Sequence, residues 1–144
     1  MPARLVALIV MFSAALCAAC GKDATTPTAA SQTSDTSTRE LFQGTLSSLD
    51  SRFYSFNVTS PSPVQITLVS LTTGTPAPTL SVPMRLGVGV PNGADCEVIE
   101  AVITVPGLAS QLSVALATGT YCAKLSDEGN LRTPAAFTVR IVHH

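Results

Sequence analysis

The strongest constraint on the fold is a pattern of apolar residues at every second position, repeated in short runs from residue 41 onward. The clearest run is 51–59, where Tyr54, Phe56 and Val58 alternate with polar residues. Side chains two positions apart lie on one face of a strand, so this run predicts a strand with one buried face. The segment 47–50, Ser-Ser-Leu-Asp, predicts a turn that joins it to a strand at 41–46.

Further runs of the same kind follow, and Pro, Gly or Asn residues separate them. Pro83 interrupts one of these runs and indicates an edge or a bulge at that point. About eight strands at a spacing of roughly ten residues predict an all-β domain, an antiparallel β-sandwich or jelly roll. The remaining strands are predicted at 64–69, 80–90, 96–105, 112–116, 121–125 and 137–141.

The first residues of the chain predict an export signal at 1–19. Residues 5–16 are apolar, and a helix of this length would cover about 18 Å, which is short of a hydrocarbon core of about 30 Å. The stretch is therefore typical of the apolar region of a secretory signal peptide. A buried core helix is the alternative, and it is disfavoured by the polar tract that follows.

Residues 16–21 resemble the lipobox of bacterial lipoproteins, in which two small residues precede a cysteine. Ala18 and Ala19 match the small positions, whereas Cys17 stands where an aliphatic residue is usual. The resemblance implies that Cys20 becomes the lipid-modified N-terminus and anchors the protein in a membrane. Because Gly21 replaces the Asp that retains such proteins at the inner membrane, it implies the outer membrane, with the domain periplasmic or surface-exposed. Cleavage after an alanine without lipidation is the alternative.

Residues 20–38 predict a tether between the lipidated cysteine and the folded domain. From residue 22 this segment is rich in Ser and Thr and has no aromatic or large aliphatic residue. It cannot bury enough apolar surface to offset the entropy of ordering, so we expect a disordered coil. Such a coil would span about 20–25 Å on average. The folded domain is then predicted at 39–144.

Several short motifs within this domain resemble the bacterial pre-peptidase C-terminal domain, which is often appended to secreted peptidases. The resemblance extends from about residue 40 to the end of the chain and implies a jelly-roll-like β-sandwich. Related collagen-binding modules bind calcium through acidic residues near the start. Asp50 matches one such position, but Arg52 stands where a second acid is common, so we expect no metal. The matching motifs are Gly44-Thr45-Leu46, Asp50, Tyr54-Ser55-Phe56-Asn57-Val58, Gly119-Thr120-Tyr121 and Phe137-Thr138-Val139.

Cys96 and Cys122 are the two cysteines left in the predicted domain. An even pair in an exported domain predicts a disulfide, because the compartment is oxidising. Closing a loop of this length would contribute roughly 3–4 kcal/mol to stability. Neither cysteine has a histidine nearby or a CxxC spacing, so a zinc site or a catalytic thiol is a poor match.

The sequence has few other residues that could catalyse a reaction or bind a metal. His143 and His144 are the only histidines, and we interpret them as a frayed tail or the end of a final strand. Glu97 and Glu100 are an odd number apart, so we expect them on opposite faces as solvated charges. The segment 127–130 predicts a loop, with calcium binding as a minor alternative.

No cofactor is expected, because no helix follows the glycines at 87–89 to complete a phosphate loop. Charged residues make up 12% of the chain and the net charge is -1, so there is no basic surplus for nucleic acid. The leading hypothesis is a non-enzymatic, lipid-anchored envelope protein that binds protein or polysaccharide. The alternative is a structural subunit that self-associates through strand edges, for which the strand at 80–90 is the candidate. An enzyme is the third hypothesis.

Overall fold

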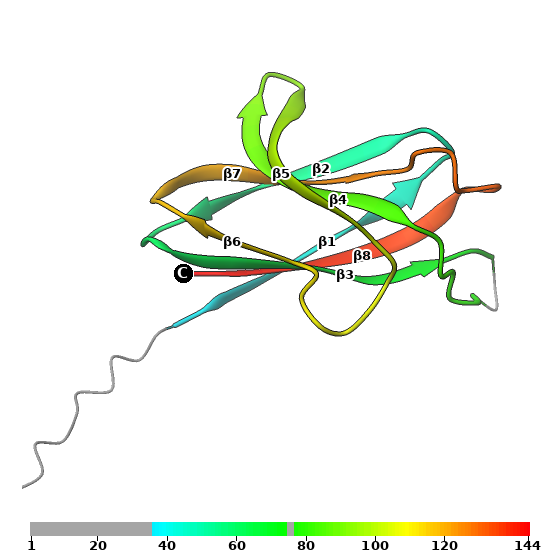
Figure 1. Cartoon of the computed structure of the whole chain (residues 1–144), viewed down its shortest axis with the longest axis horizontal. Coiled ribbons are helices and arrows are strands. Elements are labelled where there is room, and N and C mark those ends of the chain that lie inside the picture. Colours follow the sequence, from blue (N-terminus) through cyan, green and yellow to red (C-terminus); the bar gives the residue numbers. More distant parts are fainter. Residues whose placement is uncertain (1–35, 75–76) are drawn as a thin grey trace, which may run out of the picture. The chain divides into compact units, whose positions relative to one another are not determined.

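The structure is a computed structural model that describes residues 36–74 and 77–144. The predicted signal peptide, Cys20 and most of the predicted tether lie outside the described residues. Within them there are eight strands and no helix, which confirms the all-β prediction (Figure 1). No helix among the described residues is long and apolar enough to cross a membrane. The strands are β1 (Thr38–Leu46), β2 (Ser51–Val58), β3 (Ser62–Thr72), β4 (Met84–Asn92), β5 (Asp95–Thr104), β6 (Leu112–Leu116), β7 (Gly119–Ser126) and β8 (Ala135–His143).

The strands form two four-stranded antiparallel sheets that pack as a sandwich. The first sheet has the order β1-β8-β3-β6 and the second has the order β2-β7-β4-β5. The β4–β5 connection is the one hairpin of the described chain in which consecutive strands pair within a sheet. Every other connection crosses from one sheet to the other, as in known β-sandwiches.

The core lies between the sheets and consists of the alternating apolar residues of both. Phe56 and Val58 of β2 are buried, as the alternation predicts, and Phe42 of β1 packs edge-on against Phe137 of β8 with ring centroids 4.9 Å apart. Each fully buried aliphatic or aromatic side chain contributes roughly 1.5–3 kcal/mol. The side chains that are most completely buried are Leu46, Ile66, Leu68, Leu71, Met84, Leu86, Leu125, Ile141, Val58, Val64, Val88 and Val139.

The strand predicted at 80–90 differs from the structure in two ways. It begins only at Met84, directly after Pro83, because proline has no N–H to donate to a ladder. Leu80 and Val82 still pack against the core, outside any strand. In addition, β4 lies between β7 and β5, so both of its edges are occupied. The idea that this strand pairs with a partner is therefore wrong, and the free edges belong to β1, β2, β5 and β6.

Two glycines of β4 allow β5 to bend over the outer surface of its own sheet. A Cβ atom on Gly89 would overlap the carbonyl oxygen of Glu97, and one on Gly87 would lie 2.9 Å from Cγ1 of Val98. The register also shifts here, which leaves Ile99 as an extra residue in a β-bulge. Bulges bend and twist a strand. Figure 1 shows the resulting hairpin standing out from the other strands.

Replacement of Gly89 by alanine tests this close approach. The added methyl group overlaps the backbone of β5, so we expect Gly89→Ala to lower the free energy of unfolding by about 1–3 kcal/mol. Gly119→Ala is the matched control, because its Cβ would meet only the Tyr121 ring at 3.5 Å, an ordinary contact. Urea unfolding of the purified chains measures both values. Equal stability of the two variants would contradict the packing described here.

Candidate functional site

Exposed aliphatic side chains gather on β5 and on the loop that follows it. Four of the large exposed hydrophobic residues lie between positions 99 and 108: Ile99 (57% exposed), Ile103 (53%), Val105 (41%) and Leu108 (81%). No pocket opens within residues 36–74 and 77–144, and no group of three or more metal-ligating side chains forms there. We call Glu97, Ile99, Glu100, Ile103, Val105 and Leu108 together the β5 surface.

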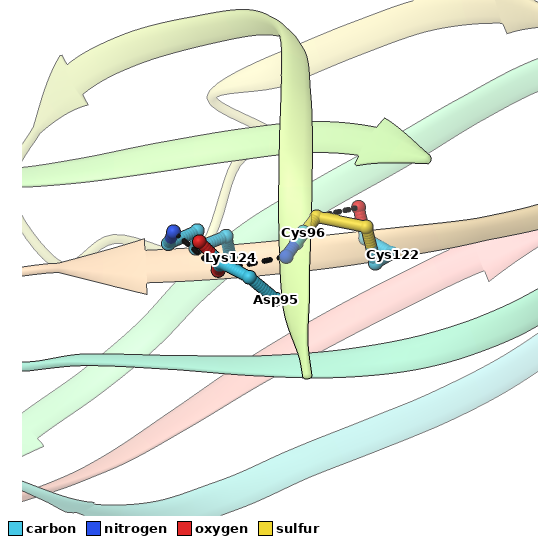
Figure 2. Close-up of a disulfide and its surroundings, with 4 residues drawn as sticks. All are labelled: Asp95, Cys96, Cys122 and Lys124. Carbon is cyan, nitrogen blue, oxygen red and sulfur yellow. Dashed lines mark hydrogen bonds and ion pairs between the residues drawn. A yellow bond between two sulfur atoms is a disulfide. The ribbon is translucent and has the colours of Figure 1, made fainter. Parts of the chain in front are cut away.

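A disulfide between Cys96 and Cys122 fixes the start of β5 to the outer face of β7. The S–S distance is 1.99 Å and the two Cα atoms are 6.0 Å apart. Strands with one strand between them lie about 9.5 Å apart in a flat sheet, and β4 separates β5 from β7 here. The short Cα distance therefore means that β5 crosses over β7 rather than lying beside it, as Figure 2 shows.

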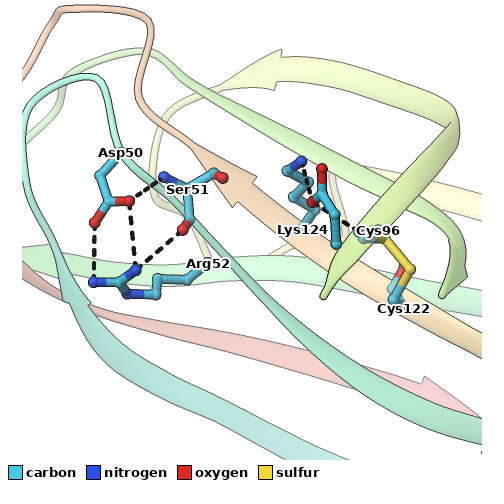
Figure 3. A network of polar contacts seen from close by, with 7 residues as sticks. Asp50, Ser51, Arg52, Cys96, Cys122 and Lys124 are labelled. Carbon is cyan, nitrogen blue, oxygen red and sulfur yellow. Dashed lines mark hydrogen bonds and ion pairs between the residues drawn. A yellow bond between two sulfur atoms is a disulfide. The ribbon is translucent and has the colours of Figure 1, made fainter. Parts of the chain in front are cut away.

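An ion pair next to the disulfide holds the same crossing. Nζ of Lys124 on β7 donates to Oδ1 of Asp95 at 2.6 Å, and the backbone N–H of Cys96 donates to the same oxygen at 2.7 Å (Figure 3). The hydrogen bond from Lys124, followed by that from Cys96, lowers the pKa of Asp95. Two adjacent residues of β5 are thus attached to β7, so the start of the strand is held in place.

The two glutamates of the β5 surface lie on the same side of the hairpin. Glu97 pairs with Val90 and Glu100 pairs with Val88, and these partners are two residues apart on β4. The expectation of opposite faces is therefore wrong, because the bulge at Ile99 adds a residue between them. Both glutamates are exposed.

These two glutamates also differ from the other carboxylates of the described residues. The structure shows no hydrogen bond or ion pair for the Glu97 and Glu100 side chains, whereas every other described carboxylate has a partner. The paired carboxylates are Glu40, Asp50, Asp95, Asp127 and Glu128. β5 therefore presents two unpaired negative charges on the face opposite that of Ile103, whose partner Arg85 lies three residues from Val88 on β4.

The loop that carries Leu108 is fixed to β3 by hydrogen bonds. The side-chain oxygen of Gln111 accepts from the N–H of Leu68 at 2.7 Å, and the N–H of Gly107 donates to the Leu68 carbonyl at 2.9 Å. Nη2 of Arg140 donates to the carbonyl of Leu108 at 2.8 Å. Leu108 is thus exposed on a loop whose backbone is held at several points.

The position that the family resemblance links to calcium contains an ion pair instead. Nη2 of Arg52 lies 3.0 Å from Oδ2 of Asp50, and the N–H of Ser51 donates to Oδ1 at 2.8 Å (Figure 3). Arg52 therefore provides the positive charge beside Asp50. Both side chains are substantially exposed, so the pair contributes little to stability.

Asp127, in the loop predicted at 127–130, is buried, and it holds the loop in place through hydrogen bonds. Its carboxylate accepts backbone hydrogen bonds from Leu49, Gly129, Asn130 and Leu131 at 2.9–3.1 Å. Burial raises the pKa of Asp127, but these hydrogen bonds outweigh burial and lower it overall. The bond to Leu49 ties this loop to the β1–β2 turn. The aspartate followed by Gly and Asn indicates a loop, but nothing in the sequence indicates the contact with Leu49.

A polar cluster of Glu40, Tyr54 and His143 was missed from the sequence. The Tyr54 hydroxyl donates to Oε2 of Glu40 at 2.5 Å, and Nε2 of His143 lies 2.7 Å from Oε1. Burial raises the pKa of Glu40, but the hydrogen bonds from Tyr54 and His143 outweigh it and lower the pKa overall. The same contact raises the pKa of Tyr54.

Of the two interpretations of His143, the end of a final strand is confirmed, because His143 ends β8 as a buried residue against the Phe56 ring. Its alternation with Val139 and Ile141 was the signal that could have placed it on the buried face. Its Nδ1 atom has no hydrogen-bond partner. The cluster closes one end of the core between β1, β2 and β8.

Comparison with known proteins identifies no family. No family model matches the chain, and no curated protein sequence matches it. Among solved structures, the chain is similar to PliG of Aeromonas hydrophila, a periplasmic lysozyme inhibitor of g-type lysozyme. The two sequences are 14% identical, and the match covers 73% of this chain and 86% of that one with a TM-score of 0.47. This similarity is too weak to bear on function.

Removal of the disulfide tests its contribution to the fold. We expect the Cys96→Ser/Cys122→Ser variant to lose about 3.5 kcal/mol of unfolding free energy, from the entropy of closing the loop between them. Urea unfolding of the non-reduced wild type and the variant gives the difference. Reduction of the wild type before unfolding is the control and should reproduce the loss. A non-reduced wild type no more stable than the variant would contradict the stabilising role.

The buried carboxylate of Asp127 predicts loss of stability in acid. Because its pKa is lower in the folded chain than in the unfolded chain, its contribution is complete above the ordinary value of about 3.9. The contribution is lost as pH falls through the folded pKa. We expect Asp127→Asn to cost about 1–3 kcal/mol at pH 7, with a difference from wild type that shrinks below pH 4.

Urea midpoints of the Asp127 variant between about pH 3 and pH 7 measure this effect. Glu128→Gln is the control, because the neighbouring Glu128 is exposed and forms only a 3.7 Å ion pair with Arg85. Its unfolding free energy at pH 7 should stay within about 0.5 kcal/mol of wild type. A difference between Asp127→Asn and wild type that is independent of pH would rule out the charge as the cause.

Proposed function

We propose that the chain is a non-enzymatic, lipid-anchored protein of the bacterial cell envelope that binds a partner protein through the β5 surface. The observation that carries the proposal is the group of exposed aliphatic side chains on β5, a strand fixed by a disulfide and an ion pair, and on the loop that follows it. Scattered exposed hydrophobic residues are normal on protein surfaces. Four of them within ten residues of one strand and the loop that follows it, on a rigid support, favour an interaction site.

The chemistry of the β5 surface favours a protein partner over a polysaccharide. Its apolar members are all aliphatic, namely Ile99, Ile103, Val105 and Leu108. Aromatic rings provide the flat faces on which sugar rings stack, and the β5 surface has none. Aliphatic side chains are complementary to the aliphatic side chains of another protein, whose contact with them removes apolar area from water.

The cellular location rests on two kinds of support. The disulfide between Cys96 and Cys122 fits an oxidising compartment outside the cytoplasm. The lipid anchor at Cys20 and the outer-membrane location rest on the sequence, since residues 1–35 lie outside the described part of the chain. A tether of about 20–25 Å would hold the domain off the membrane surface and leave the β5 surface free to meet a partner.

Photo-crosslinking in cells tests the proposal. A photoreactive amino acid replaces Ile103 in the full chain or, as a control, Leu41, which has a similar exposed fraction on the edge strand β1. We expect a protein adduct from position 103 and not from position 41, recovered with membranes. Cys20→Ser in the same chain should move it to the soluble fraction.

The possible outcomes of this experiment separate the parts of the proposal. Equal adducts at both positions, or none at 103, would contradict binding through the β5 surface. A sugar-containing adduct at 103 would change the partner class to polysaccharide. A Cys20→Ser chain that stays with the membranes would contradict the anchor.

A further inference from the structure

The outer edge of β5 is open for pairing with another strand. β5 is the last strand of its sheet, and among the described residues its backbone pairs only with β4. From Glu100 to Thr104 the pairing with β4 is regular, beyond the bulge at Ile99. An open edge exposes backbone N–H and C=O groups, and proteins often guard such edges with lysine, proline or a bulge. β5 has the bulge, but its sequence contains neither lysine nor proline.

The exposed side chains of β5 are aliphatic or acidic. Ile99 and Ile103 are more than half exposed, and Val105 and Leu108 are exposed in the loop that follows the strand. The acidic charges of β5 repel a strand of like charge but attract a cationic one, and its aliphatic side chains favour association. The edge therefore has both open backbone groups and apolar side chains to offer a partner.

We propose that β5 binds an extended segment of another protein as an added strand, and that this segment alternates cationic with aliphatic residues. The inference rests on the proposed function and specifies its partner. Glu97 and Glu100 are the unpaired carboxylates of the described residues and lie on one side of the hairpin. Lysine or arginine side chains of the added strand pair with these two glutamates. Its aliphatic side chains contact Ile103 and its neighbours.

Charge argues against a second copy of this chain as the occupant. β5 contains Asp95, Glu97 and Glu100 and has no basic residue. Two β5 strands paired antiparallel would bring glutamates of like charge close together, and like charges that face each other across strands are destabilising. A cationic strand from a different protein has the complementary charge, which favours both encounter and register.

The position of β5 is preformed for this mode of binding. The Cys96–Cys122 disulfide and the Asp95–Lys124 ion pair hold the start of the strand, and β4 pairs with its whole length. A partner strand therefore meets an edge that is already ordered, which lowers the entropic cost of association. Main-chain hydrogen bonds then contribute affinity, and alternate side chains determine specificity.

Peptide binding to the purified full chain in detergent tests the inference. The probes are three labelled eight-residue peptides: alternating Lys and Val, alternating Glu and Val, and a copy of residues 97–104. Fluorescence anisotropy gives their dissociation constants. We expect the Lys peptide to bind at least tenfold more tightly than the other two, with an affinity that falls as salt increases. Peptide binding should also slow amide hydrogen exchange at residues 100–104.

Charge variants determine whether the two glutamates select the partner. Glu97→Gln/Glu100→Gln should weaken binding of the Lys peptide at least tenfold, and Glu97→Lys/Glu100→Lys should shift the preference to the Glu peptide. Gln43→Lys/Thr45→Lys on β1 is the matched control, because it changes the net charge by the same amount as the first variant. It should alter binding less than twofold. Misfolding cannot produce the switch of preference.

Several results would overturn the inference. Equal binding of the Lys and Glu peptides would remove the role of charge, and tightest binding of the 97–104 peptide would identify a second copy as the occupant. Binding of the Lys peptide without slower exchange at residues 100–104 would exclude strand addition. If no peptide binds while the crosslink at Ile103 still forms, this inference fails and the proposed function stands.

Discussion

The absence of side chains at Gly87 and Gly89 is the constraint on which the β5 surface depends. Only bare backbone at these positions lets the carbonyl of Glu97 and the side chain of Val98 lie directly over β4. That approach in turn brings Cys96 within bonding distance of Cys122, two strands away in the sheet. The bend and the disulfide both depend on this one local feature. The sandwich core beneath is an ordinary one and needs neither of them.

Alternation of apolar and polar residues was enough to predict the fold class, because a strand with one buried face has an apolar residue at every second position. Phe56 and Val58 show this, and so do the turns marked by proline and glycine. The sequence could not predict where β5 bends, since a bulge adds one residue without changing composition. The glutamates at 97 and 100 were therefore placed on opposite sides. The sequence allowed a frayed tail or the end of a final strand at His143, and the structure shows the second of these. Strand order depends on contacts between distant residues, which no local pattern records.

Most carboxylates of the described residues have a defined local partner. Asp127 joins two connections at one end of the core through backbone hydrogen bonds, and Glu40 joins Tyr54 and His143 at a core edge. Asp50 and Asp95 pair with neighbouring cations. Against this background the free carboxylates of Glu97 and Glu100 are conspicuous. Neither of them forms an ion pair with a cation of the described residues.

The order in which the strands alternate between the two sheets also shapes how the chain reaches this structure. Thr38 pairs with His143, and β8 lies between β1 and β3 in the first sheet. That sheet cannot form until the last strand is available, and pairing across such long sequence separations makes folding slow. The β4–β5 hairpin is the exception, since its strands are neighbours in sequence and can associate within microseconds. The segment that we assign to recognition is thus the part of the domain whose strands can pair without waiting for a distant part of the chain.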